Sequence, residues 1–165
     1  DTIENRGSES VALAPERVTC DALAFSDDIA KDRLRSAVNH YQGELLPSFF
    51  LPRSDEFERW LEAERAYYAE RFIQCAWQLV EQYEQDSQAT SATHLARVVA
   101  RIASTDERML RRVMTKLYEL HDRAGAIEVY SRFAARLRKE YNVEPSAETV
   151  RLAERIRSGD HFPGK

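Results

Sequence analysis

Apolar residues recur at intervals of three and four along most of the chain, and short polar or proline-containing breaks separate these runs. This spacing places the apolar side chains on one face of an α-helix. The pattern predicts a short helical turn at Asp21–Phe25 and then six helices joined by short connections. The predicted helices are Asp27–His40, 54–85, Ala92–Ala103, Asp106–His121, Ala126–Tyr141 and Ala147–Arg157.

Polar residues at the predicted helix starts, and glycines between helices, indicate where each helix begins and ends. Ser54, Thr105 and Ser146 are predicted N-caps, because a side-chain oxygen at that position accepts from a free backbone N–H. Gly43 is predicted to end the first helix, and Gly125 is predicted to mark the turn before Ala126.

The segment before the first helix has a different pattern. Residues 1–10 are polar and are predicted to be disordered. Two short runs, Val11–Leu13 and Val18–Cys20, lie on either side of Pro15. In each run, every second residue is expected to point inward. They predict a pair of extended segments joined by a turn.

A shift of 34 residues superposes two of the predicted helices. It pairs Ala92 with Ala126, Ala96 with Tyr130 and Val99 with Phe133, which are the offsets of the apolar face in a tetratricopeptide (TPR) repeat. Small residues on such a face let paired helices approach closely. The sequence therefore predicts an all-α, TPR-like stack of antiparallel helical hairpins with right-handed repeat architecture.

An unusually apolar connection joins the first two helices. Seven of the twelve residues from 41 to 52 are Leu, Phe or Pro, and the two prolines prevent a continuous helix. We expect this stretch, together with Trp60, to be buried, so that Trp60→Ala would cost roughly 3–5 kcal/mol and Phe50→Ala would behave similarly. Whatever remains exposed of Leu45, Leu46, Phe49 and Phe50 is the first candidate for a partner contact.

Length and composition fit one helical globular domain, with 165 residues, 43% hydrophobic content and only five glycines. No apolar run approaches the roughly 20 residues of a membrane span, so no membrane association is expected. Cys20 and Cys75 form no C-x-x-C pair, which favours free thiols in a reducing, cytoplasmic compartment. The first residue is not Met, and we expect it to be a boundary or cleavage point rather than a natural start.

No sequence motif for catalysis or cofactor binding is present. The glycines are isolated, which excludes a P-loop and a G-x-G-x-x-G turn. The four histidines lie in separate predicted elements, and neither H-E-x-x-H nor G-x-S-x-G occurs. We therefore expect no enzyme activity, no metal and no cofactor.

Charge is unevenly distributed along the chain. Residues 44–89 hold 10 acidic residues and 4 arginines, whereas residues 94–139 hold 11 basic and 5 acidic residues. Six basic residues on two consecutive predicted helices are candidates for phosphate contact: Arg97, Arg101, Arg108, Arg111, Arg112 and Lys116. One interpretation is direct binding to DNA phosphates. The other, which we favour, is a solvated face partly paired with the acidic helix 54–85.

Two groups of residues, in order and suitably spaced, resemble the bacterial transcriptional activation domain (BTAD) of antibiotic-regulatory-protein-type (SARP) regulators. The first group comprises Val18–Asp21, Phe25, Tyr41–Pro47, Phe50–Pro52 and Glu56–Arg65. The second comprises Ala126–Tyr130, Leu137–Thr149, Leu152 and Ile156–Arg157. The resemblance covers about residues 11–159. The sequence departs from the family pattern at His121 and at Ser104-Thr105, where turn residues differ.

The resemblance implies a TPR-like module within a larger transcription regulator. It implies that residues 1–20 join an upstream winged-helix DNA-binding domain, that 21–157 form the domain itself, and that 158–165 are a linker, in many members toward an NTPase or other effector domain. The expected function is non-enzymatic: a helical scaffold for oligomerisation and interdomain or protein–protein contact, with a homodimer among the expected assemblies. DNA contact is then expected through the parent protein.

Overall fold

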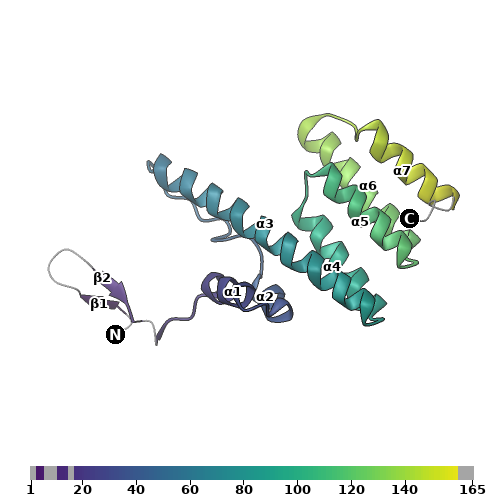
Figure 1. Ribbon diagram of the computed structural model, residues 1–165. Coiled ribbons are helices and arrows are strands. Elements are labelled where there is room, and N and C mark those ends of the chain that lie inside the picture. Colours follow the sequence, from purple (N-terminus) through teal and green to yellow (C-terminus); the bar gives the residue numbers. More distant parts are fainter. Residues whose placement is uncertain (1–2, 6–10, 15–16, 160–165) are drawn as a thin grey trace. The chain divides into compact units, whose positions relative to one another are not determined.

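Seven α-helices follow a two-stranded hairpin in the part of the chain that the computed structural model describes, residues 3–5, 11–14 and 17–159 (Figure 1). The helices are α1 (Asp21–Ala30), α2 (Leu34–His40), α3 (Asp55–Gln85), α4 (Ala89–Ile102), α5 (Glu107–Glu119), α6 (Arg123–Tyr141) and α7 (Ala147–Ser158). The predicted all-α fold class is confirmed. The chain divides within α3 into two compact units, an N-terminal unit (Asp1–Tyr68) and a C-terminal unit (Ala69–Lys165).

The strands differ from the predicted extended pair. Strand β1 (Ile3–Asn5) pairs antiparallel with β2 (Val11–Leu13), and Ile3 lies opposite Leu13. The prediction that Val18–Cys20 would be the second extended run of this pair, and that Ile3–Asn5 would be disordered, was wrong. The reason is that Cys20 is already the N-cap of α1, where its carbonyl accepts from the backbone N–H of Ala24 (3.0 Å). The predicted turn at Pro15 lies outside the described residues.

The predicted helix Asp27–His40 is two helices, because the chain turns sharply between α1 and α2. Asp32 takes a left-handed φ of 55°, a conformation that aspartate tolerates. The turn buries the Asp28 side chain, and Arg33 Nε donates to its Oδ1 (2.7 Å). Helix α2 then stops at His40, so Gly43, with φ of 141°, lies beyond the helix end that it was predicted to form.

The core of the N-terminal unit forms around Phe25. Its ring is 2% exposed and lies 5.8 Å from the ring of Tyr41 and 6.1 Å from that of Tyr68, measured between centroids. Leu34 and Leu61 are buried as well. Helices α1 and α2 pack on each other, and the first half of α3 supplies Leu61 and Tyr68 to this unit.

Consecutive helices of the C-terminal unit pack as hairpins, so the predicted TPR-like stack is confirmed (Figure 1). Five of the six residues matched by the 34-residue shift are buried: Ala92, Ala96, Val99, Ala126 and Phe133. The sixth, Tyr130, is half-buried under the guanidinium of Arg157 (5.3 Å). Alanines at these contacts let the helix backbones approach closely.

The helix starts confirm one predicted cap and correct two boundaries. Ser146 caps α7, as predicted, and accepts from the backbone N–H of Thr149. Helix α5 is capped by Asp106 instead of Thr105, and its carboxylate accepts from Met109 N (3.0 Å). Helix α6 is capped by Asp122, so Gly125 lies inside its first turn rather than in a connection. Aspartate is as good an N-cap as serine or threonine. The sequence pattern alone therefore did not decide which of two neighbouring residues forms the cap.

Candidate functional site

Large apolar side chains gather on the surface of the N-terminal unit, in the stretch predicted to be buried. We call this surface the apolar patch, and it comprises Leu46, Phe49, Phe50, Leu51, Phe57 and Trp60. Phe50 is 67% exposed, and Phe49 and Trp60 are 47% and 49% exposed. The prediction of a buried crossing, with Trp60 inside, was therefore wrong. Leu45 is half-buried at the margin of the patch.

The apolar patch is ordered by contacts with the first half of α3. The side chain of Arg65 donates to the backbone carbonyls of Leu45 (Nε, 2.9 Å) and Leu46 (Nη2, 2.6 Å), and its Nε pairs with Glu44 (2.7 Å). Glu58 accepts from the backbone N–H of Leu51 (2.8 Å). These polar contacts hold the connection against α3 and leave its apolar side chains outward.

Aromatic rings connect the two segments of the patch. Phe49 meets Phe57 edge to face, with 5.7 Å between ring centroids. Phe57 then contacts Trp60 at 5.4 Å. The rings form one contiguous aromatic surface that runs from the connection onto α3. Protein-binding surfaces are more often contiguous areas of this kind than scattered single residues.

The backbone of the connection is strained in the same region. Leu46, Ser48 and Arg53 have φ of 47°, 61° and 64°, and such left-handed conformations cost about 1–2 kcal/mol for a residue with a Cβ. The surrounding contacts offset this cost. The hydrogen bonds of Arg65 and Glu58 hold the connection in this conformation.

Exposure changes the expected effect of removing Trp60. Trp60→Ala is expected to lower the free energy of unfolding by only about 1 kcal/mol or less. Trp60 is already 49% exposed, so its removal gives up little buried apolar contact. Urea unfolding of the two proteins measures this difference. A loss of 3 kcal/mol or more, as expected for a core tryptophan, would contradict an exposed Trp60.

The six predicted phosphate contacts do not form one patch. Arg111, Arg112 and Lys116 line a groove beside α5, and Arg97 and Arg101 line a second hollow against α6. Arg108 is exposed and lines neither the groove nor the hollow. The basic side chains of the two helices point to different faces.

Four of these six residues make ion pairs within the C-terminal unit. Arg97 pairs with Asp122 (2.6 Å), Arg111 with Glu148 (3.1 Å), Arg112 with Glu81 (3.4 Å) and Lys116 with Glu84 (2.8 Å). Two of the partners, Glu81 and Glu84, lie on α3. The predicted pairing of the basic face with the acidic helix 54–85 is therefore confirmed for these two contacts. For Arg101 and Arg108, no ion pair with another described residue is present.

A polar clasp between α5 and α7 was not anticipated from the sequence. The carboxylate of Glu107 accepts from the Ser146 hydroxyl (2.6 Å), the Ser146 backbone N–H (3.0 Å) and the Thr149 hydroxyl (2.6 Å). Arg111 Nη1 also donates to Thr149 Oγ1 (2.9 Å), and Thr149 is fully buried. The only sequence signal was a threonine on an otherwise apolar helix face.

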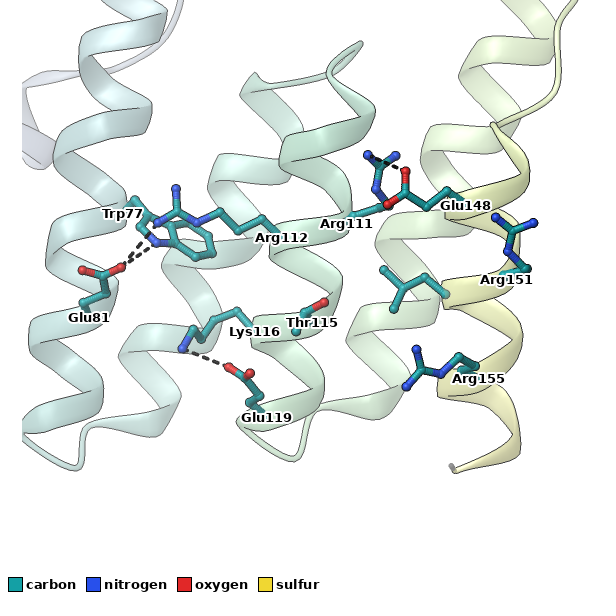
Figure 2. Close-up of a pocket in the computed structure, with 11 residues that line it drawn as sticks. Trp77, Glu81, Arg111, Arg112, Thr115, Lys116, Glu119, Glu148, Arg151 and Arg155 are labelled. Carbon is teal, nitrogen blue, oxygen red and sulfur yellow. Dashed lines mark hydrogen bonds and ion pairs between the residues drawn. The ribbon is translucent and has the colours of Figure 1, made fainter. Parts of the chain in front are cut away.

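The clasp holds the start of α7 against α5, and α7 forms one wall of the groove beside α5 that Figure 2 shows. Helix α5 forms its floor, the second half of α3 carries Trp77 and Glu81 on one side, and α7 carries Arg151 and Arg155 on the other. The groove encloses about 730 Å³. All of its lining residues belong to the C-terminal unit.

The described residues hold no group of three or more His, Cys, Asp or Glu side chains arranged to bind a metal ion. Among the described helices, none has the length and apolarity needed to cross a membrane. Neither cysteine forms a disulfide with another described residue; Cys20 is exposed and Cys75 is buried.

Comparison with protein families identifies the chain. Residues 21–157 match the model of the bacterial transcriptional activator domain. Comparisons with curated proteins and with solved structures returned no match. The family match confirms the resemblance seen in the sequence and implies the context of a SARP-type regulator. Since it spans most of the chain, this protein belongs to the bacterial transcriptional activator domain family, whose domain is a non-catalytic, helical regulatory module.

Proposed function

We propose that this module is a scaffold for self-association and protein–protein contact in a bacterial transcription regulator, and that the apolar patch is its contact surface. The observation that carries the proposal is the exposure of Phe49, Phe50 and Trp60 together on one unit. Leu46 belongs to the same surface, and Leu45 lies at its margin. Monomeric proteins rarely leave a contiguous surface of this kind in water.

The chemistry of the apolar patch suits a stable contact. Burying one Phe or Leu side chain contributes about 1.5–3 kcal/mol, and aromatic residues are enriched among those that dominate binding energy. The hydrogen bonds from Arg65 to the carbonyls of Leu45 and Leu46 already order the connection. Less conformational entropy is therefore lost when a partner binds.

The proposal places the module between other domains of a longer chain. Residues 1–20 would join it to a winged-helix DNA-binding domain, and residues 158–165 would lead toward an NTPase or other effector domain. DNA would then be contacted by the parent protein in the cytoplasm, and this module would set the spacing or pairing of the DNA-binding domains.

Direct DNA binding by the module is less well supported. Arg97, Arg111, Arg112 and Lys116 already pair with carboxylates of the same unit, and these carboxylates would repel phosphates. Arg101 and Arg108 lack such partners among the described residues. Two exposed arginines supply only a weak, salt-sensitive attraction.

Light scattering over a concentration series, at low and high salt, tests self-association. The unaltered chain is expected to dimerise, and high salt is expected to preserve the dimer because apolar contact is not screened. Phe49→Ser together with Phe50→Ser is expected to shift the dimer toward monomer by at least about tenfold in Kd, or about 1.4 kcal/mol.

Leu23→Ser is the matched control, since Leu23 is a 69% exposed apolar residue on α1 outside the apolar patch. This control is expected to leave the Kd unchanged. A monomer at every concentration would contradict self-association and would leave the patch for a different protein partner. Equal effects of the patch and control variants would show that another surface forms the dimer.

A further inference from the structure

We propose that the hollow between α4 and α6 binds the phosphate of a phosphorylated side chain in a partner polypeptide. We call this surface the arginine hollow, and its lining includes Arg97, Arg101, Glu128, Val129, Arg132 and Arg136. All of its lining residues belong to the C-terminal unit. The inference therefore does not depend on the apolar patch of the N-terminal unit.

The arginine hollow keeps a surplus of positive charge after the carboxylates paired with its lining are counted. The lining holds four arginines and one carboxylate, Glu128. Asp122, outside the lining, pairs with Arg97 (2.6 Å). Four positive charges against two negative ones leave a surplus of two, with His94 in the lining counted as neutral. Helix α4 adds no other carboxylate, because it contains neither Asp nor Glu.

The two carboxylates lie beside two of the four arginines. Arg97 contacts both of them, since it pairs with Asp122 (2.6 Å) and lies 3.6 Å from Glu128. Arg132 pairs with Glu128 as well, one turn away on α6 (2.5 Å). These contacts form one neutral cluster toward the start of α6.

The surplus consequently lies on Arg101 and Arg136. Arg101 is exposed in the last turn of α4 and makes no ion pair with another described residue. Arg136 Nη1 donates to the backbone carbonyl of Ser104 (3.1 Å), a neutral acceptor that orders the guanidinium without cancelling its charge. Glu140, one turn beyond Arg136, is outside the lining and forms no ion pair with it. The carbonyl end of α4 offsets only about half of one charge.

A phosphomonoester matches this surplus in charge and in shape. It carries about −1.5 to −2 charges at pH 7 and three strong acceptor oxygens, whereas a carboxylate carries a single charge. All four cations of the lining are arginines, whose planar N–H groups donate in pairs to the oxygens of one phosphate. Arg136 is already ordered by Ser104, which reduces the entropy lost on binding.

Size and the order of charges favour one phosphate on a polypeptide over a nucleic acid. The hollow encloses about 240 Å³, less than the roughly 300–1,000 Å³ of larger ligand sites. Asp122 and Glu128 precede Arg136 along α6, and their charges would repel the next phosphate of a nucleic acid. A polypeptide instead places apolar neighbours of the phosphorylated residue against Ala100 and Val129 in the lining.

Fluorescence anisotropy with a labelled probe tests the inference on the full chain. The probe is a short blocked peptide with a phosphoserine between leucines. The same peptide with serine or aspartate at that position is the charge control. Inorganic phosphate and a thymidine oligonucleotide, added as competitors, test the other sources of phosphate. We expect the phosphoserine peptide to bind at least about tenfold more tightly than each of these, with affinity that falls as salt rises.

Removal of charge locates the site. Arg101→Gln together with Arg136→Gln is expected to weaken the phosphoserine peptide at least about tenfold. Arg108→Gln with Arg151→Gln is the matched control, because it removes equal charge from exposed arginines outside the hollow; a change below about twofold is expected. Arg101→Gln alone leaves the Arg136 contact with Ser104 intact, and it is expected to weaken binding at least about threefold.

Several results would overturn the inference. One is equal weakening by the two double substitutions, which would show non-specific attraction. Others are equal binding of the serine or aspartate peptide, or unchanged affinity in the Arg101→Gln protein. Inorganic phosphate that binds as tightly as the peptide would assign the hollow to a free anion, and tighter binding of the oligonucleotide would assign it to nucleic acid. Because dimerisation is measured separately, each outcome leaves the proposed function of the apolar patch unaffected.

Discussion

Replacing Gly125 by alanine is expected to lower the free energy of unfolding by about 2–4 kcal/mol, through overpacking and loss of a helix cap. This glycine is buried in the first turn of α6. An added Cβ would lie 2.1 Å from Asp122 Oδ2 and 2.4 Å from Arg97 Nη2. Both distances are far below van der Waals contact.

The added Cβ would clash with the Asp122 carboxylate, which makes two stabilising contacts. Asp122 caps α6 by accepting from Gly125 N (3.0 Å), and it also accepts from Arg97 on α4 (Nη2, 2.6 Å; Nε, 3.1 Å). An alanine must displace this carboxylate, and both contacts then weaken together. Urea denaturation followed by circular dichroism gives the change in free energy.

The same substitution in a second variant tests whether this clash causes the loss of stability. In a protein that already carries Arg97→Ala and Asp122→Ala, the nearest obstructing atoms are absent. Gly125→Ala is expected to be neutral or stabilising there, because alanine favours helix over glycine by about 1 kcal/mol. Equal losses in both backgrounds would show that the Arg97–Asp122 pair is not the reason that glycine is needed.

Glu107→Ala is expected to cost about 2–3 kcal/mol and to loosen α7 from α5. The carboxylate of Glu107 accepts from Ser146 and Thr149 at the start of α7. Hydrogen bonds to a charged group contribute about 1.5–3 kcal/mol, and a negative charge near a helix N-terminus adds a smaller stabilisation. Hydrogen exchange of α7 amides, compared with those of α4, measures the local loosening.

The same side chain predicts a dependence on pH. Burial alone would raise the pKa of Glu107, but hydrogen bonds from Ser146 and Thr149 outweigh it and lower the pKa below its ordinary value of 4.5. The folded state therefore binds this proton less readily than the unfolded state does. The stabilisation is present above pH 4.5 and is lost as the pH falls through the lower pKa of the folded state. Glu107→Gln should remove this pH-dependent contribution.

Glu148→Ala is the control for the clasp. Its side chain is 68% exposed and pairs only with Arg111 among the described ion pairs, so a loss of about 0–1 kcal/mol is expected. A Glu107 variant as stable as this control, with unchanged exchange of α7, would contradict a stabilising clasp.

Local patterns in the sequence determined most of the helical architecture. The predicted helix 54–85 corresponds to α3, Asp55–Gln85, and the Ser146 cap and the apolar faces of α4 and α6 are as predicted. These features depend on residues three or four positions apart, or on one cap and the N–H groups of the next turn. Periodicity and cap chemistry are therefore sufficient to reveal them.

Only the tertiary structure decided which surfaces are available for function. The stretch around Phe50 is as apolar as a core segment, yet Arg65 and Glu58 hold its backbone so that its side chains face outward. The groove depends on Glu107 and Thr149, which lie 42 positions apart. Burial and ion pairing are set by neighbours distant in the chain, and a single sequence does not specify those neighbours. For this reason the sequence shows which residue types form the apolar patch and the groove beside α5. It does not show their exposure, their grouping or their charge balance.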